Sequence, residues 1–223
     1  MKPEEFGSYF DHTLLKPYAT IADFEAFCQE GLECCVKALM VNPAAVILCK
    51  RLVENCGVSI GTTVGFPLGQ ATVEAKKFEA IDAIHKGSNE IDYVINIAEV
   101  KNNNYNYIKE EMKAMVFICQ EMGAVSKAIF ENCYLTDEEK KALCDTASEA
   151  GPDFIKTSTG FGTGGATLQD VKLMREYTVP SVKIKASSGI RTLNDAITMI
   201  EAGAERIGTS LTPVIIEEFL SSR

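Results

Sequence analysis

Four charged residues stand inside stretches that are otherwise typical of buried β-strands. Asp92 lies in EIDYVIN, Lys127 in SKAIFEN, Lys156 in DFIKTSTG and Lys185 in SVKIKASSG. Charged side chains are rarely buried unless they are paired. For any one of them, an ion pair or an exposed sheet edge would explain the charge. Together they predict that adjacent strands point opposite charges into one site.

Two lysines beside each other near an apolar interior favour nucleophilic chemistry. A lysine amine with the reference pKa of about 10.4 is almost wholly protonated at pH 7 and cannot attack a carbonyl. Burial and a neighbouring cation both penalise the ammonium form, and lowering a pKa by about 3 units corresponds to roughly 4 kcal/mol. A pair formed by Lys156 and Lys185 therefore suits a Schiff-base nucleophile. Lys183 shares the parity of Lys185, so strand periodicity alone does not choose between them.

Glycine-rich segments follow the last three predicted strands: GFGTGG (Gly160–Gly165), SSGIRT (ending at Thr192) and IGTS (Ile207–Ser210). Backbone N–H groups in a glycine-rich turn that leads into a helix bind phosphate through oriented donors and the helix dipole. Each segment alone is equally typical of a tight turn. Three of them in succession predict a phosphate monoester as the substrate class.

These residues need a scaffold, and the sequence alternates short β-rich runs with longer helical patterns. The runs are rich in Val, Ile, Phe and Thr and are bounded by turn residues. The predicted strands are Cys34–Val41, Ser59–Phe66, Glu90–Asn96, Ser126–Asn132, Asp153–Thr159, Ser181–Ser187 and Arg206–Ser210, with a weaker one at Asp11–Lys16.

Helical patterns lie between the predicted strands, with recognisable starts and stops. Thr136 begins a capping box and Thr192 is a cap, while glycines 87, 123, 151 and 203 follow helical stretches. The predicted helices are Thr20 to about Glu30, Ala71–Lys86, Tyr107–Met122, Thr136–Ala150 and Leu193–Glu201.

Repeated strand–helix units predict a parallel sheet, because parallel neighbours need crossover helices. Eight such units make a (β/α)8 TIM barrel of the α/β class the leading fold. A doubly wound open sheet is the alternative, disfavoured because no G-x-G-x-x-G turn follows the first strand. No linker or low-complexity tract interrupts the chain, so residues 1–223 are predicted to form a single barrel domain.

Composition narrows the functional classes. The 223 residues are 46% hydrophobic and 24% charged, with mean hydropathy +0.02, and no run approaches the roughly 20 apolar residues of a membrane helix. The net charge of −9 argues against a nucleic-acid surface, which gathers Lys and Arg. The acidic N-terminus lacks the apolar run of a signal peptide, and we expect a cytoplasmic protein with neither membrane nor nucleic-acid partners.

Eight cysteines and two histidines bear on metal and disulfide chemistry. No C-x-x-C pair occurs, so a metal cluster is not expected, and the absence of a secretory signal argues against disulfides. We expect reduced, mostly buried thiols, no cofactor and no metal. Among the histidines, His12 is expected to be a hydrogen-bonded structural residue and His85 to lie on the surface.

Seven segments in order resemble the deoxyribose-phosphate aldolase family. They run from Asp11 to Ser210, roughly nine-tenths of the chain. The segments are DHTLLKP (Asp11–Pro17), VGFPLG (Val64–Gly69), EIDYVIN (Glu90–Asn96), KAIFEN (Lys127–Asn132), DFIKTSTGF (Asp153–Phe161), KASSGIRT (Lys185–Thr192) and AGAERIGTS (Ala202–Ser210).

The resemblance implies a metal-independent class I aldolase that reversibly cleaves 2-deoxy-D-ribose 5-phosphate to D-glyceraldehyde 3-phosphate and acetaldehyde. By position, Lys156 corresponds to the Schiff-base lysine, Lys185 to the second lysine that perturbs it, and Asp92 to the carboxylate that moves protons. Seven further residues correspond to substrate-binding positions, and the last five of them would hold the phosphate: Asp11, Lys127, Gly160, Phe161, Ser188, Gly189 and Ser210. A homodimer is implied as well.

Two other functions stay open: a different Schiff-base aldolase of sugar phosphates, and a non-catalytic sugar-phosphate-binding barrel. Three positions depart from the family pattern, and two of them, Ser188 and Leu211, motivate the second. Met40 replaces a frequent cysteine near the site, Ser188 stands where a glycine is frequent, and Leu211 replaces a second serine.

Overall fold

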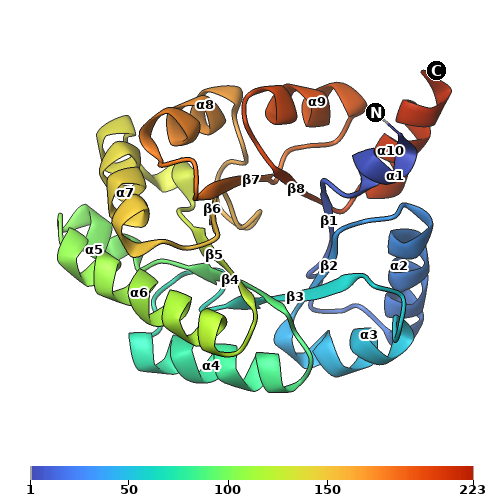
Figure 1. Cartoon of the computed structure of the whole chain (residues 1–223), viewed down its shortest axis with the longest axis horizontal. Coiled ribbons are helices and arrows are strands. Elements are labelled where there is room, and N and C mark those ends of the chain that lie inside the picture. Colours follow the sequence, from blue (N-terminus) through green and yellow to red (C-terminus); the bar gives the residue numbers. More distant parts are fainter. Residues whose placement is uncertain (1, 223) are drawn as a thin grey trace.

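The computed structural model describes residues 2–222, and within them eight parallel strands close into a barrel (Figure 1). Each strand pairs with the next along the chain, and β1 pairs with β8 to close the ring. The strands are β1 Phe10–Leu14, β2 Ala38–Val41, β3 Ser59–Val64, β4 Glu90–Val94, β5 Val125–Ile129, β6 Phe154–Lys156, β7 Lys183–Ser187 and β8 Arg206–Thr209. The predicted TIM barrel is confirmed, and closure of the sheet excludes the doubly wound alternative.

Helices surround the barrel on the outside, as Figure 1 shows. Helix α1 packs on α10, where the rings of Phe6 and Phe219 stack 4.3 Å apart, so both ends of the described chain meet beside β1. The helices are α1 Pro3–Gly7, α2 Ile21–Glu33, α3 Val46–Leu52, α4 Val73–His85, α5 Ile97–Lys101, α6 Tyr105–Glu121, α7 Asp137–Ala150, α8 Leu168–Tyr177, α9 Leu193–Glu201 and α10 Thr212–Ser221. Two single 3₁₀ turns lie at Pro43–Ala45 and Asn132–Tyr134.

The predicted helix caps are present. Thr136 Oγ1 accepts a hydrogen bond from the Glu139 N–H, and the Glu139 carboxylate accepts one from the Thr136 N–H, which completes the capping box of α7. Thr192 and Asp195 form the same arrangement at α9. Such caps satisfy N–H groups that have no partner within the helix, which is why the sequence signal locates these helix starts well.

All eight predicted strands are longer than the observed ones, and two of them, Cys34–Val41 and Asp153–Thr159, are longer by four residues. The first four residues of Cys34–Val41 are not extended, because α2 continues to Glu33 and Cys35 adopts a left-handed φ of 52°. In Asp153–Thr159, the strand β6 ends at Lys156. Thr157 still donates its N–H to Lys185 O, and the residues after it form the irregular loop that leads to Leu168.

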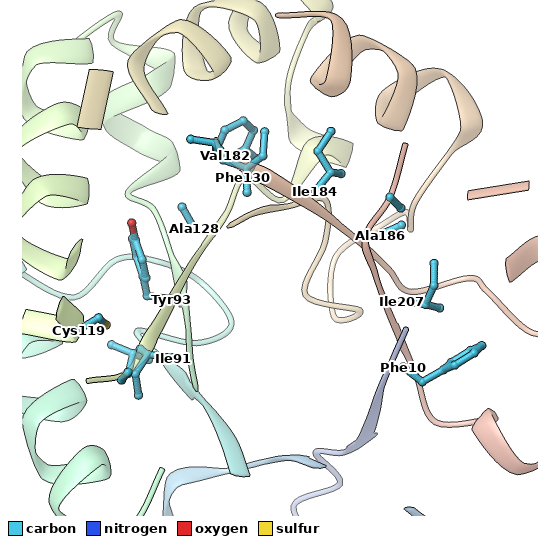
Figure 2. Close-up of a cluster of buried hydrophobic side chains, with 14 of the residues drawn as sticks. Phe10, Ile91, Tyr93, Cys119, Ala128, Phe130, Val182, Ile184, Ala186 and Ile207 are labelled. Atoms are coloured by element: carbon cyan, nitrogen blue, oxygen red, sulfur yellow. The ribbon is translucent and has the colours of Figure 1, made fainter. Parts of the chain in front are cut away.

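The apolar core lies between the strands and the helices, as Figure 2 shows around Ile91, Tyr93, Ala128, Ile184 and Ala186. Because successive side chains of a strand point to opposite faces, outward packing of these residues turns their neighbours toward the barrel axis. The inward neighbours on β4, β5 and β7 include the charged residues Glu90, Asp92, Lys127 and Lys185.

The described residues include neither a disulfide nor a helix that could span a membrane. All eight cysteines are free thiols, and five of them are buried, as expected for reduced packing residues. No described helix combines the length and the apolar character that crossing a bilayer requires.

Candidate active site

Strand register brings the four charged strand residues together. Asp92 on β4 is the register partner of Lys127 on β5, and Lys156 on β6 is the partner of Lys185 on β7. All four side chains enter the barrel and are almost fully buried. The prediction that adjacent strands point opposite charges into one site is confirmed.

The Asp92 carboxylate is the centre of this cluster. Its Oδ1 accepts a hydrogen bond from Lys127 Nζ at 2.9 Å. Its Oδ2 accepts hydrogen bonds from Lys156 Nζ and Lys185 Nζ, each at 2.7 Å. One carboxylate oxygen therefore bridges the two amines that the sequence paired.

A second layer of buried charges lies against the first and includes two residues that the sequence analysis missed. Arg206 on β8 donates from Nη2 to Glu90 at 2.7 Å and from Nε to Asp11 Oδ1 at 2.7 Å. Asp11 Oδ2 lies 2.5 Å from Lys185 Nζ, and Lys127 forms an ion pair with Glu90. Parity could have found Glu90, because it precedes Asp92 by two residues and shares its face.

The described cluster holds one more cation than carboxylates: Lys127, Lys156, Lys185 and Arg206 against Asp11, Glu90 and Asp92. A buried excess charge has no solvent to stabilise it. Loss of one proton from a lysine therefore neutralises the cluster.

The pKa shifts follow from burial and from this arrangement. Burial opposes ionisation of Asp92, but the ammonium groups of Lys127, Lys156 and Lys185 outweigh it and hold the pKa of this carboxyl well below its usual range. Burial disfavours the ammonium form of Lys127 as well, yet its surrounding carboxylates raise its pKa.

Lys185 shifts in the opposite direction. Burial lowers its pKa to about 8; the carboxylates of Asp11 and Asp92 oppose this effect, and the cations of Lys127 and Lys156 add to it. Within the cluster, Lys185 is therefore a group that changes protonation close to neutral pH.

A cavity of about 800 Å³ opens above this cluster at the carboxyl ends of the strands. Lys156 lines its floor, and all five predicted phosphate residues line its wall: Gly160, Phe161, Ser188, Gly189 and Ser210. In TIM barrels the active site lies at this end, with phosphate near the last two loops.

Backbone geometry in the wall differs among these residues. Gly160 and Gly189 have left-handed φ values of 89° and 80°, and within residues 2–222 their N–H groups donate no hydrogen bond. The Phe161 N–H, in contrast, donates to Thr159 Oγ1 at 3.0 Å, so it is already engaged. Gly160 and Gly189 are thus better placed than Phe161 to offer backbone donors to an anion.

Comparisons with known proteins agree with this geometry. Residues 7–212 match the model of the DeoC/LacD family aldolases. A deoxyribose-phosphate aldolase from Bacteroides thetaiotaomicron is 47% identical over 97% of this chain and 91% of that protein, and one from Thermococcus kodakarensis is 48% identical over 97% and 98%. The chain belongs to the DeoC/LacD aldolase family. It is a class I aldolase.

Solved structures support the same assignment. The aldolase QR15 superposes with a TM-score of 0.92 at 40% identity, covering 97% of this chain and 96% of that one. The deoxyribose phosphate aldolase from Aeropyrum pernix, described as tetrameric, gives a TM-score of 0.91 at 33% identity, covering 100% and 94%.

Two residues expected to bind substrate in this aldolase lie deeper than that role requires. Asp11 and Lys127 are completely buried and do not line the cavity. Their contacts are with the charged cluster, so a direct contact with substrate does not fit this arrangement. Asp11 contacts Lys185, and Lys127 contacts Asp92.

The structure also resolves the ambiguity on β7. Lys183 lies at the start of the strand, is half-exposed and is 3.9 Å from Glu205, whereas Lys185 points into the barrel. His12 is buried between Thr212 and Glu30, and His85 is exposed, as expected.

The three departures from the family pattern fall in different places. Met40 is buried in the barrel against Gly61 and does not line the cavity. Leu211 and Ser188 both line the cavity. Ser188 has a left-handed φ of 70°, and its hydroxyl lies over Gly160.

Proposed function

We propose that this aldolase reversibly cleaves 2-deoxy-D-ribose 5-phosphate to D-glyceraldehyde 3-phosphate and acetaldehyde through a Schiff base on Lys156. One observation carries the proposal: within the described chain, Lys156 is the amine of the buried cluster that lines the cavity. Its relatives from Bacteroides and Thermococcus, named deoxyribose-phosphate aldolases, support the choice of substrate.

The first chemical step needs a neutral amine. Lys156 in that form attacks C1 of the open-chain aldehyde, and loss of water gives a protonated imine. The shared oxygen of Asp92 lies 2.7 Å from Lys156 Nζ and from Lys185 Nζ, so a proton lost from one amine has a short path to the other. Lys185, with a pKa of about 8, holds or releases that proton near neutral pH.

The imine is then the electron sink for breaking the C2–C3 bond. The C3 hydroxyl loses its proton, the C2–C3 electron pair moves toward the imine, and glyceraldehyde 3-phosphate leaves an enamine on Lys156. Asp92, acting through water, accepts the hydroxyl proton and helps to return one to C2. Hydrolysis of the resulting imine releases acetaldehyde and restores the amine.

Phosphate binding would hold the substrate in register for this chemistry. Within residues 2–222, the N–H groups of Gly160 and Gly189 on the cavity wall donate no hydrogen bond, and Ser188 and Ser210 add hydroxyl groups. Anchoring the far end of a substrate converts an encounter into an oriented, effectively intramolecular reaction.

Borohydride trapping tests the nucleophile. The protein is incubated with acetaldehyde, reduced, digested and mapped by mass spectrometry. We expect a reduced adduct on Lys156 in the native chain and in the control variant Lys183→Ala, which replaces a half-exposed lysine at the start of β7. Lys156→Ala should carry no adduct. An adduct on another lysine, or near-normal turnover by Lys156→Ala, would contradict the proposal.

Substrate choice needs a separate assay. Release of acetaldehyde from 2-deoxy-D-ribose 5-phosphate is compared with cleavage of other sugar phosphates. Preference for another sugar phosphate, with trapping intact, would favour a different Schiff-base aldolase. The non-catalytic barrel is disfavoured because simple binding does not require a buried amine pair on one carboxylate.

Three expectations about organisation stay predictions. We propose a homodimer, which light scattering tests; a monomer or the tetramer described for the Aeropyrum pernix enzyme would overturn it. Residues 1–223 are proposed to unfold as one domain in calorimetry, and cell fractionation tests the expected cytoplasmic location.

A further inference from the structure

The loop that follows Lys156 has no regular structure until α8 begins at Leu168. It carries three of the cavity residues, Thr159, Gly160 and Phe161. A loop so rich in glycine needs external contacts to hold one shape, because glycine adds conformational freedom. The contacts at its two ends therefore determine how it presents its backbone to the cavity.

Glu131 makes the contact at the first end. It follows β5, its side chain is 1% exposed, and its backbone is left-handed with φ 47° and ψ 62°. That conformation is costly for a residue with a side chain and persists only where surrounding structure enforces it. Its position is reinforced from β6, since the N–H of Phe130 donates to Lys156 O and the N–H of Asn132 donates to Thr157 O.

The Glu131 carboxylate accepts two hydrogen bonds from Thr159. Oε1 accepts the Thr159 N–H at 3.2 Å, and Oε2 accepts a short hydrogen bond from the Thr159 hydroxyl. The same hydroxyl oxygen accepts the Phe161 N–H at 3.0 Å. This chain of bonds fixes the residues on both sides of Gly160, whose own N–H makes no hydrogen bond within the described chain.

Packing holds the remainder of the loop. A Cβ on Gly162 would lie 2.8 Å from Cys133 Sγ and 3.0 Å from Glu131 Cδ, so the loop rests directly on these two side chains. At the far end, the Ala166 N–H donates to Ser187 O and Ser188 O at 3.1 and 3.0 Å. The loop is thus held by Glu131 at its first end, and at its far end by Ser187 and Ser188, which line the cavity.

We propose that Glu131 is a positioning residue for phosphate recognition: through Thr159 it fixes the loop so that the Gly160 N–H faces the anion. This rests on the proposed function for the identity of the substrate. Glu131 does not line the cavity and has no part in the carbon–carbon chemistry. Its effect should therefore appear in affinity for phosphate and not in formation of the Schiff base.

The test compares Glu131→Gln and Thr159→Val with Thr159→Ser, which keeps the hydroxyl. Glu74→Gln, an exposed carboxylate on α4, is the matched control. For each variant, KM and kcat are measured with 2-deoxy-D-ribose 5-phosphate and with unphosphorylated 2-deoxy-D-ribose. Binding of inorganic phosphate is measured in parallel by calorimetry, and folding by thermal unfolding.

We expect Glu131→Gln and Thr159→Val to raise KM for the phosphorylated substrate at least about tenfold, the factor that 1.4 kcal/mol of lost binding produces. Values for unphosphorylated deoxyribose and the extent of borohydride trapping should change less than about threefold, a difference of under 1 kcal/mol. Thr159→Ser and Glu74→Gln should behave as the native chain.

Three results would overturn the proposal: equal losses with both sugars, no change with either, or failure of Thr159→Ser to match the native chain. If the native chain does not cleave the phosphorylated sugar, the proposed function fails instead. The phosphate titration still decides the role of Glu131 in that case, because it requires no turnover. Unchanged affinity of Glu131→Gln for inorganic phosphate would then refute it.

Discussion

Lys156 and Lys185 are register partners on β6 and β7, and both amines lie 2.7 Å from the same carboxylate oxygen. Parallel neighbours in register send their side chains out of the sheet at the same height on the same face. Burial lowers the pKa of Lys185 to about 8, so this amine takes up or releases a proton near neutral pH. The arrangement makes one neutral amine available without removing the carboxylate that orients it.

Replacing Lys185 with Met should suppress activity and move its pH dependence. In the native chain the pKa of Lys185 is about 8, so the cluster holds its extra proton below that pH and loses it above. Since the reactive amine must be neutral, kcat/KM should rise with pH through about 8. The variant cluster has three cations and three carboxylates, and loss of a proton would leave it negative.

We therefore expect Lys185→Met to lose at least about 100-fold in kcat/KM at pH 7, the range of a missing proton-transfer group. Its rise in activity should move to higher pH. The measurement is a pH profile of kcat/KM, with Lys183→Met on the same strand as control. A profile that still rises near pH 8 would contradict this account.

Replacing Glu90 with Gln should move the profile in the other direction. Glu90 pairs with Lys127 and with Arg206, and its loss leaves two excess cations in the cluster. A more positive cluster releases a proton more readily, so the rise should shift to lower pH by up to about one unit, or roughly 1.4 kcal/mol. The same pH profile measures it, under conditions where circular dichroism shows the variant folded. A shift toward higher pH would refute the charge-balance argument.

Replacing Asp92 with Asn should separate adduct formation from proton transfer. Asn keeps the shape but cannot accept protons as a carboxylate does. We expect a folded protein with kcat reduced at least about 100-fold, because proton return to C2 is impaired. Exchange of the methyl protons of acetaldehyde in D₂O, followed by NMR, reports that step directly. Exchange at the native rate would rule out this role, and Asp82→Asn, on the exposed side of α4, should exchange normally.

The sequence predicted the barrel and the central charges because both depend on local rules. Alternation of strand and helix patterns gave the topology, and charges at positions that should be apolar marked Asp92, Lys127, Lys156 and Lys185. Applying the same parity rule to Glu90 and Arg206 would have extended the cluster. Neither residue stood out, since each lies at the first position of its strand, where a solvent-exposed charge is common.

The depth of each charged side chain in the barrel and the contacts between loops could not be predicted from the sequence. Asp11 lies in one of the family motifs, as Lys156 does. The strand register nevertheless places it in the second layer of buried charges, away from the cavity. Strand β6 ends at Lys156. Beyond it, Glu131 accepts a hydrogen bond from Thr159, so this contact joins two loops that are 28 residues apart in the sequence. The closed sheet determines such contacts, and no periodic pattern in the sequence indicates them.

A second buried ion pair lies outside the charged cluster and holds the loop after β3. Lys76 on α4 donates to Glu111 on α6 at 2.5 Å, to Gly69 O at 2.8 Å and to Val94 O at 2.7 Å. Glu111 in turn accepts the Asn96 N–H at 2.9 Å. Burial lowers the pKa of Lys76 and raises that of Glu111, and each partner opposes the shift of the other. The pair joins two helices to the ends of β3 and β4, with both side chains wholly buried.

Replacing Lys76 with Met should therefore destabilise the fold strongly. It leaves the Glu111 carboxyl and two carbonyl groups buried without their donor, and breaking a buried pair in this way costs about 3–5 kcal/mol. For a chain of this size that lowers Tm by on the order of 10 °C. Lys77→Met, which removes the exposed pair with Glu74, should cost at most about 1 kcal/mol. The double variant Lys76→Met/Glu111→Leu should recover part of the loss in calorimetry, since it removes the unpaired carboxyl; equal Tm values for Lys76→Met and Lys77→Met would show that this pair does not hold the loop.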